Sequence, residues 1–98
     1  MIAEKEGRGG KAAKSSRRRT ILVAESDIYT ANAICNILQY NHYLPITAGD
    51  GEQMKHMMTD YKPELLLLGA ELPRGGGIEA IERIRCRDGL PIIVISEC

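Results

Sequence analysis

The chain has 98 residues, of which 44% are hydrophobic and none is Trp or Phe, so it can form about one small domain with an aliphatic core. Its formal net charge is zero, but residues 1–20 hold seven Lys or Arg and two Glu, a net charge of +5, while the remainder holds six basic and eleven acidic residues, a net charge of −5. No apolar stretch approaches the ~18 residues of a membrane span, and the basic leader lacks the apolar segment of a secretory signal. We therefore expect a cytoplasmic protein that makes no membrane contact.

Residues 1–19 are predicted to be a disordered tail, because they supply few large apolar side chains. A basic tail on an acidic body is typical of nucleic-acid association, and the candidate contacts are Arg17, Arg18 and Arg19. The alternative is a solvated leader or an expression remnant, and the Arg and Ser content also leaves mitochondrial-type targeting open. The three cysteines form no CxxC pair, which suits reduced thiols in a cytoplasm.

The ordered domain is predicted to span residues 20–98. Residues 21–24 are a short apolar and partly β-branched run, which indicates a buried strand. Ser26 or Asp27 is suited to cap a helix over residues 28–40. The inward face of this helix is predicted from its three- and four-residue spacing to be Ala31, Ile34, Cys35 and Leu38.

The next two elements are predicted to be an edge strand and a second helix. Residues 44–48 form the strand, and Pro45 favours an edge position because proline cannot donate to a neighbouring strand. A turn at residues 49–51 contains Asp50, which is suited to cap a helix over residues 52–61. The inward stripe of this helix is predicted to be Met54, Met57, Met58 and Tyr61.

The last three elements repeat the alternation of strand and helix. Residues 65–68 are four leucines that indicate a buried strand, and residues 91–95 indicate a fourth. Between them residues 77–87 predict a helix whose inward residues are Ile78, Ile81 and Ile84. The whole pattern, strand–helix–strand–helix–strand–helix–strand, predicts an α/β fold with a parallel sheet and helices on both faces.

Five short segments of the chain have the order and spacing of one known family. They are Ile21–Asp27, Ala48–Glu52, Lys62–Glu64, Leu72-Pro73 followed by Gly77, and Leu90–Ser96. Across residues 18–97 they resemble the receiver domain of two-component response regulators. The resemblance implies a flavodoxin-like fold with strand order 2-1-3-4-5, of which these residues lack the last part.

The resemblance also implies a phosphorylation site. In that family a carboxylate at the end of the third strand accepts a phosphoryl group beside Mg²⁺, which an acidic pair and a backbone carbonyl hold. A hydroxyl after the fourth strand and a lysine after the fifth contact the phosphoryl oxygens. Carried over by position, the acidic pair falls on Glu25 and Ser26, the phosphoacceptor on Gly69, the carbonyl on Glu71 and the switch hydroxyl on Ser96. Because glycine has no side chain, the phosphoacceptor position is vacant.

This incomplete set predicts a pseudo-receiver. Mg²⁺ needs hard oxygen ligands, commonly one or two carboxylates with phosphate, so we expect weak binding through Glu25 and the Glu71 carbonyl, or none, and no other cofactor. Neither Glu71 nor Asp27 occupies the strand end that directs a nucleophile. His42 and His56 have no nucleophile at a suitable spacing, so we predict no catalytic residues and no enzymatic activity.

Three functional hypotheses follow from these features. The first is a signalling module that acts through protein–protein contacts, with a partner or a second copy bound at the exposed edge of the strand at residues 91–95. The second is a nucleic-acid-associated regulator that uses the basic tail. The third is that the chain is a fragment of a longer response regulator.

Overall fold

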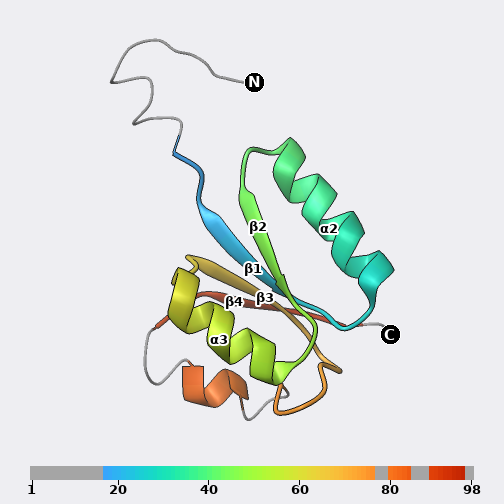
Figure 1. Ribbon diagram of the computed structural model, residues 1–98, viewed down its shortest axis with the longest axis vertical. Coiled ribbons are helices and arrows are strands. Elements are labelled where there is room, and N and C mark those ends of the chain that lie inside the picture. The colour runs from blue at the N-terminus through green and yellow to red at the C-terminus, as the bar shows by residue number, and fades with distance from the viewer. Residues whose placement is uncertain (1–16, 77–79, 85–88, 97–98) are drawn as a thin grey trace.

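The computed structural model describes residues 17–76, 80–84 and 89–96. Within them, four parallel strands form one sheet in the order β2-β1-β3-β4 (Figure 1). The strands are β1 (Thr20–Ala24), β2 (Leu44–Ala48), β3 (Leu65–Gly69) and β4 (Ile92–Ile95). The predicted parallel α/β fold is confirmed, and β2, which contains Pro45, lies at an edge of the sheet as predicted. Of the predicted tail at residues 1–19, residues 1–16 lie outside the described residues and residues 17–19 are exposed.

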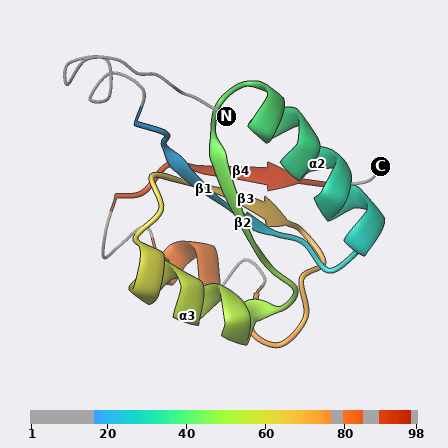
Figure 2. The same ribbon diagram turned by 45° about the horizontal axis from the view of Figure 1, so that its top comes forward.

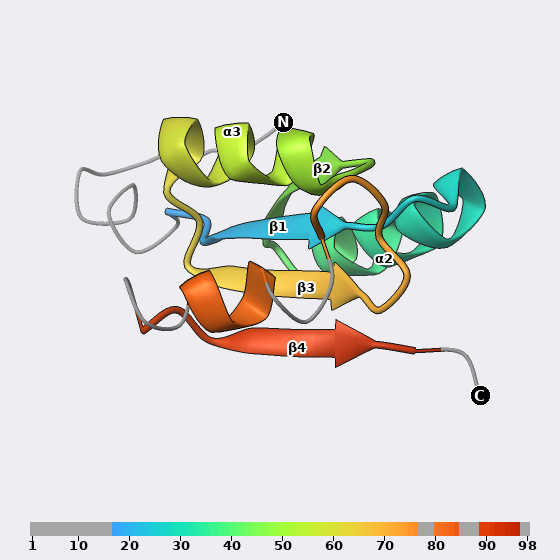
Figure 3. The same cartoon turned by 90° about the horizontal axis from the view of Figure 1, so that it is seen from below.

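The strands are aligned so that their carboxyl ends reach the same edge of the sheet. Ala24 of β1 lies opposite Ala48 of β2 and Leu68 of β3, and Gly69 of β3 lies opposite Ile95 of β4. Figure 3 shows β1, β3 and β4 running side by side with their arrowheads at the same end. The segments that follow these strands therefore meet at one place, which is where open α/β sheets bind their ligands.

Helix α2 (Ile28–Tyr40) covers one face of the sheet and has the predicted bounds. It begins after Asp27, whose carboxylate accepts a hydrogen bond from the Thr30 backbone amide at 3.0 Å. Its inward side chains are the four that were predicted, Ala31, Ile34, Cys35 and Leu38. They pack against the residues of β1 and β3 that point to this face, Ile21, Val23, Leu65 and Leu67.

The opposite face is covered by α3 (Gly51–Tyr61) and by the helical residues 80–84, so α2 and α3 lie on opposite sides of the sheet (Figure 2). The core on this side contains the alternate residues of β1 and β3 together with Met54 and Ala80. Met57, Met58, Ile81 and Ile84 pack against it as predicted. The ends of the predicted helix at residues 77–87, including Ile78, lie outside the described residues.

Two predictions of burial are wrong. Tyr61 is 56% exposed rather than part of the inward stripe, because it is the last residue of α3 and its hydroxyl favours water. Strand β4 is not fully buried, since Ile93 is 52% exposed and Val94 is 48% exposed. Within the described sheet β4 has only β3 as a neighbour, and α2 packs against β1 and β2 instead of β4.

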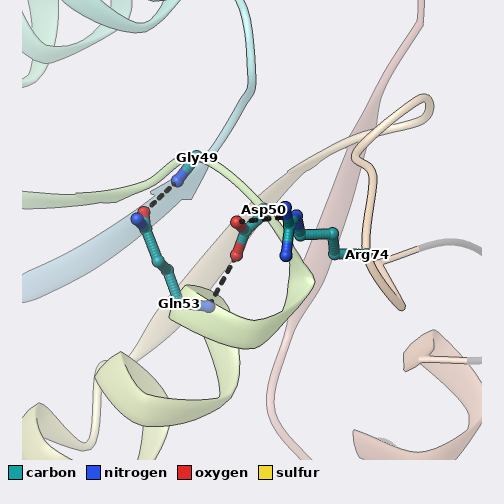
Figure 4. A network of polar contacts seen from close by, with 4 residues as sticks. All are labelled: Gly49, Asp50, Gln53 and Arg74. Carbon is teal, nitrogen blue, oxygen red and sulfur yellow. Dashed lines mark hydrogen bonds and ion pairs between the residues drawn. The ribbon is translucent and has the colours of Figure 1, made fainter.

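The turn before α3 is held by a small polar network (Figure 4). The Asp50 carboxylate accepts a hydrogen bond from the Gln53 backbone amide at 2.8 Å, and the Gln53 side-chain oxygen accepts one from the Gly49 amide at 2.7 Å. This reciprocal pattern resembles a capping box. Arg74 adds an ion pair to Asp50, with 3.8 Å between the nitrogen and the oxygen, so the loop after β3 is joined to the start of α3.

Candidate functional site

A pocket lies at the carboxyl ends of β1, β3 and β4. The segment after β1 leads into α2, and the segment after β3 is joined to β4 by a hydrogen bond from the Ala70 amide to the Ile95 carbonyl at 2.9 Å. The pocket is lined by Glu25, Ser26, Asp27, Thr30, Ala70, Glu71, Ile95 and Ser96. Four predicted site residues, Glu25, Ser26, Glu71 and Ser96, are therefore brought together by the parallel arrangement of the strands.

The fifth predicted position, Gly69, is buried at the end of β3 beside this pocket. A Cβ atom placed on Gly69 would lie 2.5 Å from Glu25 Oε1 and 3.3 Å from the Ala24 carbonyl oxygen. A distance of 2.5 Å is shorter than real contacts of a Cβ atom, so the Glu25 carboxylate fills the space that a side chain at position 69 would enter. A residue larger than glycine at position 69 would therefore require the Glu25 carboxylate to shift.

Glu25 is held in this place by its own part of the chain. Its backbone amide donates to the Ala48 carbonyl at 2.9 Å, which continues the pairing of β1 with β2 by one residue. Its Oε2 atom accepts a hydrogen bond from the Asp27 amide at 2.9 Å. The carboxylate is thus directed back over the end of the sheet by a local contact at the beginning of α2.

Asp27 and Thr30 add a second polar group to the pocket. Besides the backbone hydrogen bond of the cap, the Thr30 hydroxyl donates to Asp27 Oδ2 at 2.5 Å. These two hydrogen bonds hold the pKa of the Asp27 carboxyl below its usual value, and the bond from the Thr30 hydroxyl has the larger effect. Thr30 was not predicted as a site residue, although its place three residues after the cap is the sequence signal that directs it toward the pocket.

The possible Mg²⁺ ligands at this pocket are the side chains of Glu25, Asp27 and Glu71 and the Glu71 carbonyl. No group of three or more His, Cys, Asp or Glu side chains in residues 17–76, 80–84 and 89–96 is arranged to hold a metal ion. The carboxylates of Glu25 and Asp27 both accept backbone hydrogen bonds. Weak Mg²⁺ binding through Glu25 and the Glu71 carbonyl stays a prediction.

The predicted nucleic-acid contacts lie apart from this pocket. Arg17, Arg18 and Arg19 are exposed and precede β1, whereas the pocket lies at the other end of that strand. The Arg19 carbonyl accepts a hydrogen bond from the Leu44 amide at 2.9 Å, so the chain is already fixed to β2 at this point. Any contact through the three arginines would therefore involve a different end of the domain from the pocket.

Comparison with known proteins identifies the class to which this fold and pocket belong. Residues 21–98 match the model of the response regulator receiver domain, and the chain belongs to this family. It is 30% identical over 78 residues to a protein-glutamate methylesterase/protein-glutamine glutaminase of Bacillus licheniformis, covering 78% of this chain and 22% of that protein. It is 29% identical over 82 residues to the phosphate regulon transcriptional regulatory protein PhoB of Escherichia coli, covering 80% of this chain and 35% of PhoB.

A solved structure supports the same assignment. The N-terminal domain of a response regulator receiver protein from Methanoculleus marisnigri is 28% identical, with a TM-score of 0.71, over 76% of this chain and 63% of that one. The chain thus has the receiver fold of two-component response regulators, and it spans 22% and 35% of the length of the two curated relatives named above. None of the described helices is long and apolar enough to cross a membrane.

Proposed function

We propose that this chain is a pseudo-receiver, which acts in two-component signalling through protein–protein contacts and without phosphorylation of an aspartate. The observation that carries the proposal is the end of β3. Gly69 offers no nucleophile there, and the Glu25 carboxylate lies 2.5 Å from the place where a Cβ atom would be. A carboxylate acceptor cannot be presented from this strand end without displacing Glu25.

The charge of the pocket supports the same conclusion. Phosphoryl transfer depends on positioning and on neutralisation of the phosphoryl oxygens. Of the residues that line the pocket, three are acidic, Glu25, Asp27 and Glu71, and none is basic. A pocket of this charge depends on a bound divalent cation to receive an anionic phosphodonor. Without a closely held divalent cation, the lining residues have no positive group to offset the repulsion.

The test is incubation of the 98-residue chain with acetyl phosphate and Mg²⁺, followed by rapid quenching and intact mass measurement. We expect no added phosphoryl group, while a receiver that has an aspartate at the end of β3 gains one in parallel. Hydroxylamine cleaves an acyl phosphate but not a phosphoserine, so it separates modification of a carboxylate from modification of Ser26 or Ser96. A hydroxylamine-sensitive adduct would overturn the proposal.

For the contact surface we propose the exposed edge of β4. Ile93 and Val94 are about half exposed on a strand whose outer edge has no neighbour among the described strands. Such an edge presents apolar side chains and unpaired backbone groups to another strand, from a partner or a second copy. Val94→Lys should reduce that association, and the same change at exposed Tyr61, on the far end of α3, is the matched control. Equal behaviour of the two variants would argue against this edge.

A second candidate function is nucleic-acid association, favoured by the three consecutive exposed arginines at residues 17–19. Binding of this kind releases counterions and weakens steeply with salt. Deletion of residues 1–19 should abolish binding to duplex DNA, measured by fluorescence anisotropy at two salt concentrations. Unchanged affinity after the deletion would eliminate the tail as the binding element.

The third reading is that these residues belong to a longer response regulator, since the two named relatives extend over several times the matched length. Sequencing of the transcript beyond the codon for Cys98 tests it. A further strand ending in lysine, followed by a helix, would establish the longer regulator, whereas an immediate stop codon would exclude it.

A further inference from the structure

The outer face of α2 has a composition that the core does not explain. With 3.6 residues per turn, the face opposite the buried residues of α2 is formed by positions separated by four, three and four residues. These positions are Tyr29, Ala33, Asn36 and Tyr40, and all of them are exposed. Tyr29 is 81% exposed and Tyr40 is 86% exposed. In Figure 1 this helix lies at the margin of the molecule with one side turned away from the sheet.

This face carries no charge. The 13 residues of α2 include no Asp, Glu, Lys, Arg or His. A surface helix ordinarily places charged side chains opposite its buried stripe. Instead, α2 holds four of the nine large hydrophobic residues that are exposed in the described part of the chain, Ile28, Tyr29, Ile37 and Tyr40. An exposed apolar surface of this kind marks a site of protein–protein contact.

The order of residues along the face suits one occupant in particular. The spacing of four, three and four reads the same in both directions, so a rotation of the helix about the midpoint between Ala33 and Asn36 exchanges the two tyrosines. They are eleven residues apart, about three turns or ~16 Å along the axis. Of the two central residues, Ala33 is small and allows the backbones to come close. The same spacing is that of the a and d positions of a coiled-coil seam.

We propose that the outer face of α2 binds the outer face of α2 in a second copy of this chain, with the two helices antiparallel. Tyr29 of each copy then packs against Tyr40 of the other, at both ends of a two-fold symmetric interface. Ala33 and Asn36 form the centre, where an amide between apolar layers fixes the register of the pair. The antiparallel direction also places the positive end of each helix dipole beside the negative end of the other.

The charge of the rest of the domain favours the same surface. Residues 21–98 carry a net charge of −5, so two copies repel each other over most of their surfaces. A two-fold interface places the groups near its axis beside their own copies, and a helix without charges avoids like-charge contacts there.

The size of the face sets the strength of the contact. A tyrosine buries roughly 150–250 Å², so two of them, with Ile37 at the flank of the face, stay below the ~800 Å² per partner of a standard interface. The pair is therefore at the small end of specific interfaces, and its dissociation constant is expected in roughly the micromolar range. This inference is independent of the pseudo-receiver proposal, because it involves neither Gly69 nor the pocket.

The test begins with sedimentation velocity of the 98-residue chain from low micromolar to millimolar concentration. We expect a reversible monomer–dimer equilibrium. Tyr29→Ala and Tyr40→Ala should each weaken it at least about tenfold, because each change removes the aromatic contact at both ends of the two-fold interface, while Tyr61→Ala leaves it unchanged. Tyr29 and Tyr40 contribute little to the core, so the thermal unfolding of the monomeric variants should resemble that of the wild type. A chain that stays monomeric, or a dimer that tolerates both substitutions, would overturn the proposal.

The direction of the helices is tested by cysteine pairing in a background with Cys35, Cys86 and Cys98 changed to serine. A Tyr29→Cys chain mixed with a Tyr40→Cys chain should form a disulfide-linked heterodimer under mild oxidation. Neither chain alone should form a linked homodimer at a comparable rate. Rapid linkage of either homodimer would show a parallel or unrelated pairing and would refute the antiparallel arrangement.

Discussion

Gly51, the first residue of α3, is the position where the addition of one methyl group should be most damaging. A Cβ atom there would lie 2.3 Å from the Arg74 carbonyl oxygen and 2.5 Å from backbone atoms of both Gly75 and Gly76. The Gly51 amide also donates a hydrogen bond of 2.7 Å to the Pro73 carbonyl. All of the obstructing atoms are backbone, so the loop after β3 has to move away from α3 as a unit.

The magnitude of the effect of Gly51→Ala follows from three terms. Overpacking of this kind costs about 1–3 kcal/mol, and loss of the hydrogen bond to Pro73 costs about 0.5–1.5 kcal/mol. Against them, alanine is favoured over glycine within a helix by up to about 1 kcal/mol. The net loss in the free energy of unfolding is therefore about 1–3 kcal/mol, and at ~4–8 °C per kcal/mol for a domain of this size Tm should fall by roughly 5–20 °C.

The assay is thermal and urea unfolding of the full 98-residue chain, followed by circular dichroism at one protein concentration. Gly49→Ala is the matched control, because the nearest atom to its added Cβ would be Gln53 Oε1 at 3.5 Å, an ordinary contact. The two variants add the same methyl group two residues apart in the same turn. If Gly51→Ala is no less stable than Gly49→Ala, the close contact between the loop and α3 does not exist in solution.

Three further predictions concern α2, its thiol and the sheet. Asp27→Ala should lower Tm at neutral pH through loss of the helix cap. Because the pKa of the Asp27 carboxyl is lower in the folded chain, its contribution to stability is present above the unfolded pKa of about 3.9 and is lost as the pH falls through the folded pKa. The difference in Tm between the variant and the wild type should therefore shrink in that acid range. Burial raises the pKa of the Cys35 thiol. In a chain with the other two cysteines changed to serine, iodoacetamide at pH 8 should therefore alkylate Cys35 more slowly than free cysteine, and the reaction should accelerate in urea. Equal alkylation rates for Cys35 and free cysteine would contradict the burial of this thiol. Leu66→Ala in strand β3 truncates a side chain with no exposed surface. The free energy of unfolding in urea should fall by about 2–5 kcal/mol, which is enough to unfold much of a small domain. A fall below about 1 kcal/mol, as for a surface substitution, would contradict the packing.

Much of the fold follows from local pattern. The bounds of α2 were predictable because Asp27 supplies a cap and the apolar residues after it keep a helical period without interruption. The strands were predictable because each is a short apolar run ended by polar or glycine residues. The resemblance to receiver domains supplied the predicted residues of the pocket, and parallel strands in register explain why the segments that hold them lie together.

The sequence does not encode distances between segments that are far apart. Periodicity places Tyr61 on the same helical face as Met54, but it cannot show that the sheet no longer covers the last residue of α3. The contact of Gly51 with the loop at residues 73–76 depends on the path of a loop, for which glycine content is only a weak signal. The position of the Glu25 carboxylate over Gly69 depends on a side-chain rotamer set by the Asp27 amide.

The contact between Gly69 and Glu25 has an evolutionary consequence. A mutation that introduced an aspartate at position 69 would begin a second acidic side chain at the place that the Glu25 carboxylate occupies. Two carboxylates so close disfavour each other's ionised forms, and steric relief requires Glu25 to leave its hydrogen bond to Asp27. An aspartate at position 69 therefore requires the Glu25 side chain to take another position. We therefore expect the effects of substitutions at positions 25 and 69 to depend on each other.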